Sequence, residues 1–146
     1  MMEYSILLKD QICFPVYALS REIINHYRPL LDEMDLTYPQ YLVMMVLWEE
    51  KIQTVNQLGD KLMLDSGTLT PLLKRLQQKG IINRERSSED ERVVFISLAD
   101  EGVALLDQAL CIPERITNSL GISEEDLVQL KSITNKILNR QQKSNQ

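Results

Sequence analysis

Cysteine and histidine are scarce in this chain. Its 146 residues include two cysteines, Cys13 and Cys111, and a single histidine, His26. Two thiols cannot form a framework of several disulfides, and these three side chains do not have the spacing of a metal site. We therefore expect no disulfide-stapled fold, no bound metal and no cofactor.

Long apolar runs are absent as well. No stretch reaches the 18 consecutive apolar residues that a membrane-spanning helix needs. The opening segment, MMEYSILLKDQICF, lacks the basic start and the small-residue cleavage site of a secretory signal. We expect a cytoplasmic protein with reduced thiols and no membrane partner.

The distribution of charge is more informative than the net charge of −5. Residues 66–88 contain five basic residues and one acidic residue, a local balance of +4 that leaves −9 for the rest of the chain. Attraction to phosphate depends on the local charge of a surface, so an acidic body with one basic stripe is compatible with DNA binding. The basic residues of the stripe are Lys74, Arg75, Lys79, Arg84 and Arg86.

Helical periodicity marks the first third of the chain. Apolar residues recur at steps of three and four from Ile12 to Leu30, which predicts one long amphipathic helix. Pro15 lies either in the first turn of this helix or at a kink within it. Thr37 and Gln40 form a capping box, so a second helix is expected over residues 38–50.

The middle of the chain has the element order of a helix-turn-helix followed by a hairpin. A second capping box at Thr54 opens a short helix. The next helix is expected to be capped by Ser66 or Asp65 and to end at Lys79, with Gly80 in the C-terminal stop position. Two β-rich runs, residues 81–86 and 93–98, are joined by the charged loop SSEDER and predict a β-hairpin.

This order predicts a winged helix-turn-helix, a mainly α fold with a small β-hairpin wing. The helix over residues 66–79 carries leucines on one side and hydroxyls with bases on the other, and bases of the wing can meet phosphates or a minor groove. A solvated charged face explains any single base equally well, but six bases within residues 74–92 favour DNA. The candidate contacts are Ser66, Thr68, Thr70, Lys74, Arg75, Arg84, Arg86 and Arg92.

The terminal helices have apolar stripes that need a partner surface. After the wing, a helix is expected from about residue 100 toward 120, interrupted near Pro113, and a last helix carries a stripe from Leu127 to Ile137. Pairing with the same helices of a second copy would bury these stripes in a two-fold dimer. Folding back onto their own domain would bury them too, but a regulator of a two-fold DNA site favours the dimer.

Cys13 has two interpretations. A cysteine on an apolar helix face is usually a small buried hydrophobe. It becomes a reactive thiolate if tyrosine hydroxyls donate hydrogen bonds to it, because such donors lower the thiol pKa. The chain offers tyrosines at positions 17, 27, 38 and 41 as donors. Cys111 is either a second, resolving thiol or a packed cysteine, and the sequence does not bring the two sulfurs together.

The chain resembles the MarR-type regulators, and within them the organic hydroperoxide resistance regulators. The resemblance covers about residues 8–138 and is carried by QICFPVYALSREI, HYRPLLDEMDLTYPQYLVMMVLWE, LDSGTLTPLLKRLQQKGII and RSSEDERVVFISL. It implies a single MarR-type domain over residues 1–146, with a DNA-binding lobe at about 37–99 and dimerisation helices at about 4–35 and 100–143. It also implies a homodimeric repressor that leaves a two-fold symmetric, double-stranded operator when an organic hydroperoxide oxidises its N-terminal cysteine.

By the same resemblance, Cys13 is the sensing thiolate, Tyr27 and Tyr38 hold it, and Tyr17 lies nearby. The helix of residues 66–79 reads the major groove and Arg92 enters the minor groove, while Asp90 orients the wing by pairing with an arginine. Two positions depart from the family pattern: Ile122 replaces the resolving cysteine of two-cysteine members, and Ala99 replaces a helix-capping threonine. We therefore expect one sensing cysteine, resolved by a low-molecular-weight thiol.

Two other functions remain to be weighed against this redox-switched repressor. A MarR-type regulator gated by a small aromatic or fatty ligand would leave Cys13 a bystander, and its thiol would keep an ordinary pKa near 8.5. A thiol peroxidase using Cys13 and Cys111 would need a recycling motif such as C-x-x-C, which the sequence lacks. We therefore expect a regulator and not an enzyme.

Overall fold

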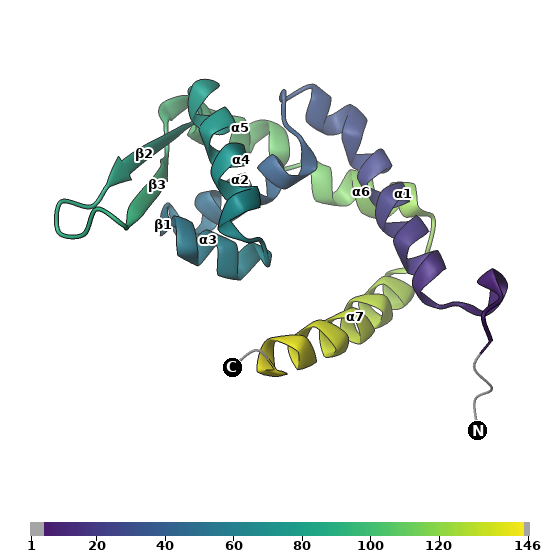
Figure 1. The fold of residues 1–146 in the computed structure, drawn as a ribbon. Helices are drawn as coiled ribbons and strands as arrows, with labels where there is room; N and C mark the ends of the chain where they lie inside the picture. Colours follow the sequence, from purple (N-terminus) through teal and green to yellow (C-terminus); the bar gives the residue numbers. More distant parts are fainter. Residues whose placement is uncertain (1–4, 145–146) are drawn as a thin grey trace. The chain divides into compact units, whose positions relative to one another are not determined.

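The computed structural model describes residues 5–144, and side chains as far as residue 140. The chain divides into two compact units, the first ending at Ile112 and the second beginning at Pro113. Figure 1 shows the elements of both units. The expectation of a single domain over residues 1–146 stays a prediction.

The first unit has the predicted order of elements, with one short strand added. A 3-10 turn precedes α1, and the hairpin strands β2 and β3 follow four helices and β1. The bounds of these elements are Leu8–Asp10 for the 3-10 turn, Cys13–Asp32 for α1, Tyr38–Glu50 for α2, Ile52–Thr54 for β1, Val55–Leu62 for α3, Ser66–Gln78 for α4, Ile82–Arg86 for β2, Val94–Leu98 for β3 and Asp100–Ala109 for α5.

Helix α1 begins at Cys13, so Pro15 lies in its first turn, where a missing N–H costs nothing. The helix ends in a Schellman turn: the N–H of Leu36 donates to the carbonyl of Leu31 at 3.0 Å, and that of Asp35 donates to Asp32 at 3.1 Å. Asp35 has φ +52°, a left-handed conformation that Asp tolerates better than most residues. This turn directs the chain into α2.

Helix α2 is the centre of the core, as its apolar composition predicts. Its capping box is present, with Thr37 accepting from the backbone of Gln40 and the Gln40 side chain accepting from the backbone of Thr37. Val43, Met44 and Leu47 are fully buried. The indole N–H of Trp48 donates to the Gly102 carbonyl of α5 at 2.9 Å.

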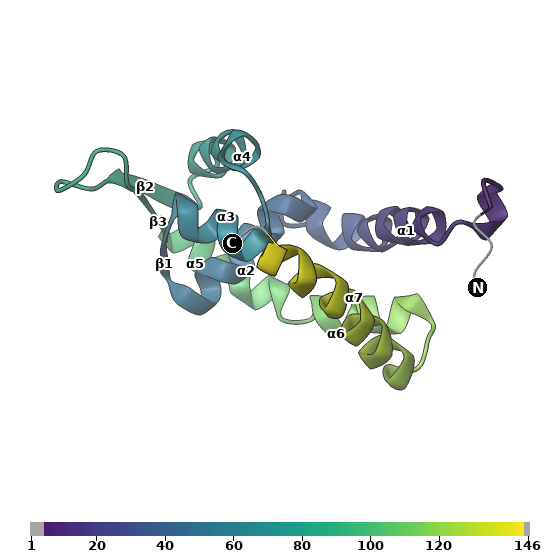
Figure 2. The ribbon, with the colours of Figure 1, turned by 60° about the horizontal axis from the view of Figure 1, so that its bottom comes forward.

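The predicted hairpin belongs to a three-stranded antiparallel sheet of order β1-β3-β2. In the central strand β3, Ile96 pairs with Gln53 of β1 on one side and with Arg84 of β2 on the other. The sequence analysis did not predict β1, because three residues between two helices carry no alternating pattern of their own. Figure 2 views α4 nearly along its axis, with the β2–β3 hairpin extending away from α4.

The remaining helices follow the predicted breaks. Helix α6 (Ile112–Leu120) is separated from α5 just before Pro113, and α7 spans Glu124–Ser144. The hydroxyl of Ser123 accepts from the backbone of Asp126 at 3.1 Å and caps α7. Ala99 occupies the N-cap of α5 with no side-chain hydrogen bond, which is the weak cap expected from its methyl group.

Candidate nucleic-acid interface and thiol site

Helix α4 presents a polar face to solvent because its apolar face is held by the core. Asp65 caps the helix by accepting from the backbone of Thr68 at 2.7 Å. Four leucines on one side are buried, while Ser66, Thr68, Lys74 and Arg75 on the other are exposed. The buried leucines are Leu69, Leu72, Leu73 and Leu76. The helix therefore offers hydroxyl and cationic donors along its outer face.

Arg92, in the wing, is paired with the carboxylate of Asp90. Arg92 donates from Nε to one Asp90 oxygen at 3.1 Å and from Nη2 to the other at 3.2 Å. These side-chain hydrogen bonds, followed by one from the Arg92 backbone, lower the pKa of the Asp90 carboxyl. The arginine that Asp90 was expected to pair with is thus Arg92 itself. The pairing leaves the Arg92 side chain 91% exposed at the tip of the hairpin.

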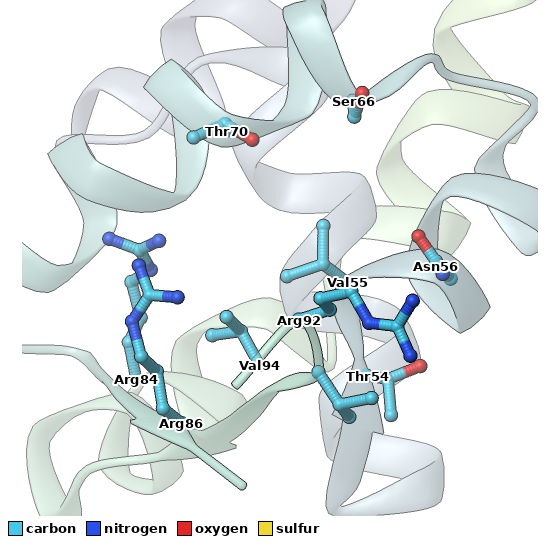
Figure 3. A pocket seen from close by; sticks show the side chains of 10 residues that line it. Thr54, Val55, Asn56, Ser66, Thr70, Arg84, Arg86, Arg92 and Val94 are labelled. Atoms are coloured by element: carbon cyan, nitrogen blue, oxygen red, sulfur yellow. The ribbon is translucent and has the colours of Figure 1, made fainter. Parts of the chain in front are cut away.

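A hollow of about 330 Å³ lies between α4, the start of α3 and the wing, and we call it the arginine hollow. Figure 3 shows Arg84 and Arg86 rising from β2 toward the side formed by α4, while Arg92 points toward Thr54 and Asn56. Residues 84 and 86 share one face of the strand because side chains alternate along it. The lining residues are Thr54, Val55, Asn56, Ser66, Thr70, Arg84, Arg86, Arg92, Val93 and Val94.

The arginine hollow is cationic, because Arg84, Arg86 and Arg92 belong to its lining. The Nε atom of Arg84 is buried, closed to solvent and without a hydrogen-bond partner, so the terminal nitrogens of the guanidinium groups are the donors open to an external acceptor. Guanidinium groups bind phosphate oxygens with a matching fork of N–H donors. The hollow therefore has the charge and donors for a phosphate group.

The structure brings together five of the predicted DNA contacts in this hollow: Ser66, Thr70, Arg84, Arg86 and Arg92. Thr68, Lys74, Arg75 and Asp90 lie outside its lining. Two lining residues at the start of α3, Thr54 and Asn56, were not predicted. The capping box at Thr54 was the available signal, since it marks the N-terminus of the helix that precedes α4.

Cys13 lies at the exposed N-terminal end of α1. Tyr17 follows one helical turn later on the same face, and the guanidinium of Arg21 lies 4.6 Å from the centre of its ring. The Cys13 side chain is open to solvent in the single chain, and the choice between a packed and a reactive cysteine stays a prediction.

Tyr27, Tyr38 and Tyr41 form a tyrosine cluster where α1 meets α2. The ring centres of Tyr27 and Tyr38 are 4.8 Å apart, and those of Tyr27 and Tyr41 are 5.8 Å apart. Burial, together with the neighbouring rings of Tyr38 and Tyr41, raises the pKa of Tyr27 to about 12. Burial also raises the pKa of Tyr38. Their hydroxyls therefore remain protonated at neutral pH and can donate.

Within one chain, Cys13 does not reach this cluster. Cys13 and Tyr27 are fourteen residues apart on the continuous helix α1, which corresponds to about 21 Å at the α-helical rise. Cys111 follows α5, is exposed, and donates from Sγ to the Gln108 carbonyl at 3.6 Å. It lies near enough to Tyr41 to add, after burial and Tyr38, to the upward shift of the Tyr41 pKa. Both cysteines are free thiols.

Neither a metal site nor a membrane-spanning helix is found among residues 5–144. No cluster of three or more His, Cys, Asp or Glu side chains in that range could hold a metal ion. No helix in that range is long and apolar enough to cross a membrane.

A capped helix with a polar outer face, beside an arginine-lined hairpin, defines a winged helix-turn-helix DNA-binding protein. A family model described as "Transcriptional regulator SarA/Rot" matches residues 25–109. The organic hydroperoxide resistance transcriptional regulator of Bacillus subtilis (strain 168) is 53% identical over 125 residues, which cover 86% of this chain and 85% of that protein. The chain belongs to the MarR/SarA family of transcriptional regulators and is not an enzyme.

Solved structures of AbfR from Staphylococcus epidermidis share the fold. The reduced protein bound to DNA has a TM-score of 0.76 at 36% identity, covering 91% of this chain and 93% of that one. The overoxidized protein bound to DNA has a TM-score of 0.75 at 36% identity, covering 90% and 93%. A disulfide form has a TM-score of 0.65 at 37% identity, covering 90% and 92%. The chain is therefore a DNA-binding regulator of the hydroperoxide-regulator type.

Proposed function

We propose that this chain is a homodimeric repressor that leaves its operator when an organic hydroperoxide oxidises Cys13. The observation that carries the proposal is that one chain has both an exposed thiol at the start of α1 and, farther along the helix, two half-buried tyrosines, Tyr27 and Tyr38, whose hydroxyls stay protonated. Protonated hydroxyls donate to a thiolate and favour the charged, nucleophilic form. Such a thiol reacts with a hydroperoxide faster than an ordinary cysteine does.

The oxidation of Cys13 to a mixed disulfide proceeds in two steps. The Cys13 thiolate attacks one peroxide oxygen, the O–O bond breaks, and the alcohol leaves after taking a proton, so that the sulfur becomes a sulfenic acid. A low-molecular-weight thiol of the cytoplasm then forms an S–S bond with this sulfur, and water leaves. Because overoxidized AbfR was crystallised bound to DNA, we propose that the mixed disulfide, and not a higher sulfur oxide, is the releasing form.

The tyrosines that hold Cys13 come from the second subunit in this proposal. Within one α1, Cys13 lies about 21 Å, or about four helical turns, from Tyr27 of the same chain. A two-fold arrangement with α1 antiparallel to its partner would place each thiol beside the other subunit's cluster. Each sensing site would then contain residues of both chains, so oxidation at either site would act directly on the dimer interface.

Exposed apolar side chains support the dimer. At the start of α1, the N-cap residue Ile12 is 75% exposed and Val16 is 57% exposed. In α7, Val128, Ile133 and Ile137 are more than half exposed. Apolar surface of this extent on a soluble chain marks an interaction surface. The proposed occupant is the same surface of a second copy.

DNA binding uses the first unit in this proposal. The outer face of α4, with Thr68, Lys74 and Arg75, enters the major groove, and Arg92 at the tip of the wing enters the adjacent minor groove. The arginine hollow between them takes a backbone phosphate, held by the guanidinium groups of its lining. Two copies of α4 must lie about 34 Å apart to read successive turns of a two-fold operator.

Operator release in matched cysteine variants tests the proposal. The wild-type protein and the Cys111→Ser variant should lose operator affinity after cumene hydroperoxide and a low-molecular-weight thiol are added. The Cys13→Ser variant should stay bound under the same conditions, as measured by fluorescence anisotropy. Release of Cys13→Ser to the wild-type extent would overturn the role of Cys13.

A ligand-gated regulator is the second candidate, because the first unit has an apolar cavity. This cavity of about 280 Å³ lies between α1 and α2, and its lining includes Ile24, Leu31, Leu36 and Arg28. It is at the lower limit of small-molecule sites. An ordinary thiol pKa for Cys13, measured from alkylation rate against pH, would favour this candidate.

A further inference from the structure

Lys79 ends the recognition helix α4, yet its charge is used inside the protein. We infer that Lys79 is a positioning residue that links the C-terminal end of α4 to the tyrosine cluster. A displacement at the sensing site therefore also displaces the DNA-reading helix. The inference rests on the proposed function, because it presupposes that oxidation of Cys13 disturbs Tyr27 and Tyr38.

The contacts of Lys79 join two segments far apart in the sequence. Its ammonium donates to the backbone carbonyl of Asp35 and lies 3.5 Å from the carboxylate of the same residue. It also donates to Oε1 of Gln40 at 3.2 Å. The side chain is 30% exposed, so its surroundings screen it less than those of a free surface lysine. The last turn of α4 is thereby tied to the turn between α1 and α2.

Both acceptors are held firmly. The carbonyl of Asp35 is oriented by the Schellman turn that ends α1, with Asp35 at φ +52°. Gln40 is 3% exposed, and its Oε1 also accepts from the backbone of Thr37 at 3.0 Å in the capping box. An amide oxygen accepts two hydrogen bonds, so Thr37 and Lys79 use the full capacity of this atom. The link is therefore rigid at the end where α1 meets α2.

The other side of this junction is the tyrosine cluster. Tyr38 is the first residue of α2, directly after the N-cap Thr37 and two residues before Gln40. Its ring is 4.8 Å from the ring of Tyr27. A displacement of Tyr38 therefore moves the capping box itself, and Lys79 carries that movement to the end of α4. The path is a continuous chain of contacts over a few residues.

The same contacts change the interpretation of the basic stripe. Lys79 contributed one of its five positive charges, but the ammonium faces Asp35 and Gln40. Its role in DNA binding is accordingly indirect. Leu72, Leu73 and Leu76 keep α4 packed without it, so loss of the ammonium should leave the lobe folded while uncoupling the end of the helix from α2.

Three variants separate this role from ordinary stabilisation. Lys79→Met keeps the aliphatic stem and removes all donors, while Lys79→Arg keeps the charge and donors. Lys61→Met is the matched control, because Lys61 also makes a lysine ion pair in the same lobe, with Glu50 at 2.7 Å, but joins α3 to the far end of α2. Each full-length protein is examined reduced and after oxidation with cumene hydroperoxide in the presence of a low-molecular-weight thiol.

Hydrogen–deuterium exchange gives a readout that does not require DNA. Oxidation of the wild type should change exchange in two places, the segment around Tyr27–Tyr41 and the amides of residues 76–81. In Lys79→Met the first change should remain and the second should be lost, whereas Lys79→Arg and Lys61→Met should show both. In parallel, the ratio of oxidised to reduced operator Kd should fall at least fivefold in Lys79→Met only.

The outcomes distinguish the positioning role of Lys79 from the sensing role of Cys13. If Lys79→Met shows both exchange changes and the wild-type ratio of operator Kd, the positioning role of Lys79 is wrong while the sensing role of Cys13 stands. Failure of Lys79→Arg to restore the wild-type response would also contradict the role of the donors. If oxidation changes neither segment in the wild type, the proposed sensing function fails, and the role of Lys79 fails with it.

Discussion

At the scale of single residues, the account depends on hydroxyl groups that keep their protons. Tyr27 has a pKa of about 12, raised first by burial and then by Tyr38 and Tyr41. At neutral pH its hydroxyl is therefore a donor and never a competing anion. A thiolate beside it gains a charge-assisted hydrogen bond, which stabilises the charged form of sulfur and lowers the thiol pKa.

Replacing Tyr27 with phenylalanine should make Cys13 less reactive. Loss of one donor removes a hydrogen bond that favours the thiolate, so roughly tenfold less of the reactive form should be present near neutral pH. The rate of Cys13 alkylation at neutral pH measures this change. Tyr41→Phe is the control, since it removes a hydroxyl from the same cluster and leaves in place the two tyrosines proposed to hold the thiol. An unchanged alkylation rate in Tyr27→Phe would contradict the assigned role.

The same variant has a consequence at alkaline pH. The folded-state pKa of about 12 exceeds the usual value of 10, so the unfolded state loses the Tyr27 proton first as pH rises. The stability that Tyr27 contributes is therefore complete below pH 10 and is lost between about pH 10 and 12. Urea unfolding should show a smaller loss of stability over this window in Tyr27→Phe than in the wild type, by about 1–2 kcal/mol.

Residue-level prediction from sequence grouped side chains where local chemistry decides and missed them where packing decides. The hydroxyls and arginines of α4 and the wing were predicted as a set, and five of them line one hollow. Thr54 and Asn56 were missed because their approach to the wing depends on how α3 packs. Lys79 was counted among free charges, since its acceptors lie about forty residues earlier in the chain.

At the scale of elements, capping residues determine where the helices begin. The boxes at Thr37 and Thr54 were predicted from the T-x-x-Q spacing and are both present. The start of α1 at Cys13 resolves the question of Pro15 in favour of the first turn. Strand β1 could not be predicted, because its pairing with β3 is a long-range contact that joins residues 52–54 to residues 95–97.

The N-cap of α5 offers a test at this scale. Ala99 has extended backbone angles suited to a cap, φ −78° and ψ 169°, but no side-chain acceptor. Ala99→Ser should supply that acceptor and stabilise the protein by about 1 kcal/mol, measured by urea unfolding. Ala104→Ser, in the middle of the same helix, should give no gain. Equal effects of the two serines would show that capping is not the cause.

At the scale of the whole molecule, the account requires two copies. Cys13 and the tyrosine cluster do not meet within one chain, and both α1 and α7 carry exposed apolar side chains. A second copy would bury these side chains and complete each sensing site. The same two-fold symmetry would set the distance between the two α4 helices, so oxidation at the interface would alter the fit to DNA.

A charge in the apolar stripe of α7 should break this assembly. Sedimentation of the wild type should give a dimer of two 16.9 kDa chains. Ile133→Glu should shift the protein toward monomer and weaken operator binding, because it places a charge in a desolvated interface. Asn135→Glu lies on the opposite face of the helix and should remain dimeric. A dimeric Ile133→Glu variant with wild-type operator affinity would exclude this part of α7 from the interface.

The central claim is that oxidation of Cys13 itself releases the operator. The most direct measurement titrates the operator-bound protein with cumene hydroperoxide in the presence of a low-molecular-weight thiol. Mass spectrometry gives the fraction of Cys13 in mixed disulfide, and fluorescence anisotropy gives the fraction of operator released, from the same samples. We predict that release increases together with the Cys13 disulfide and stops when that disulfide is complete. Release while Cys13 remains a thiol, or a complete Cys13 disulfide on a protein still bound to its operator, would contradict the account.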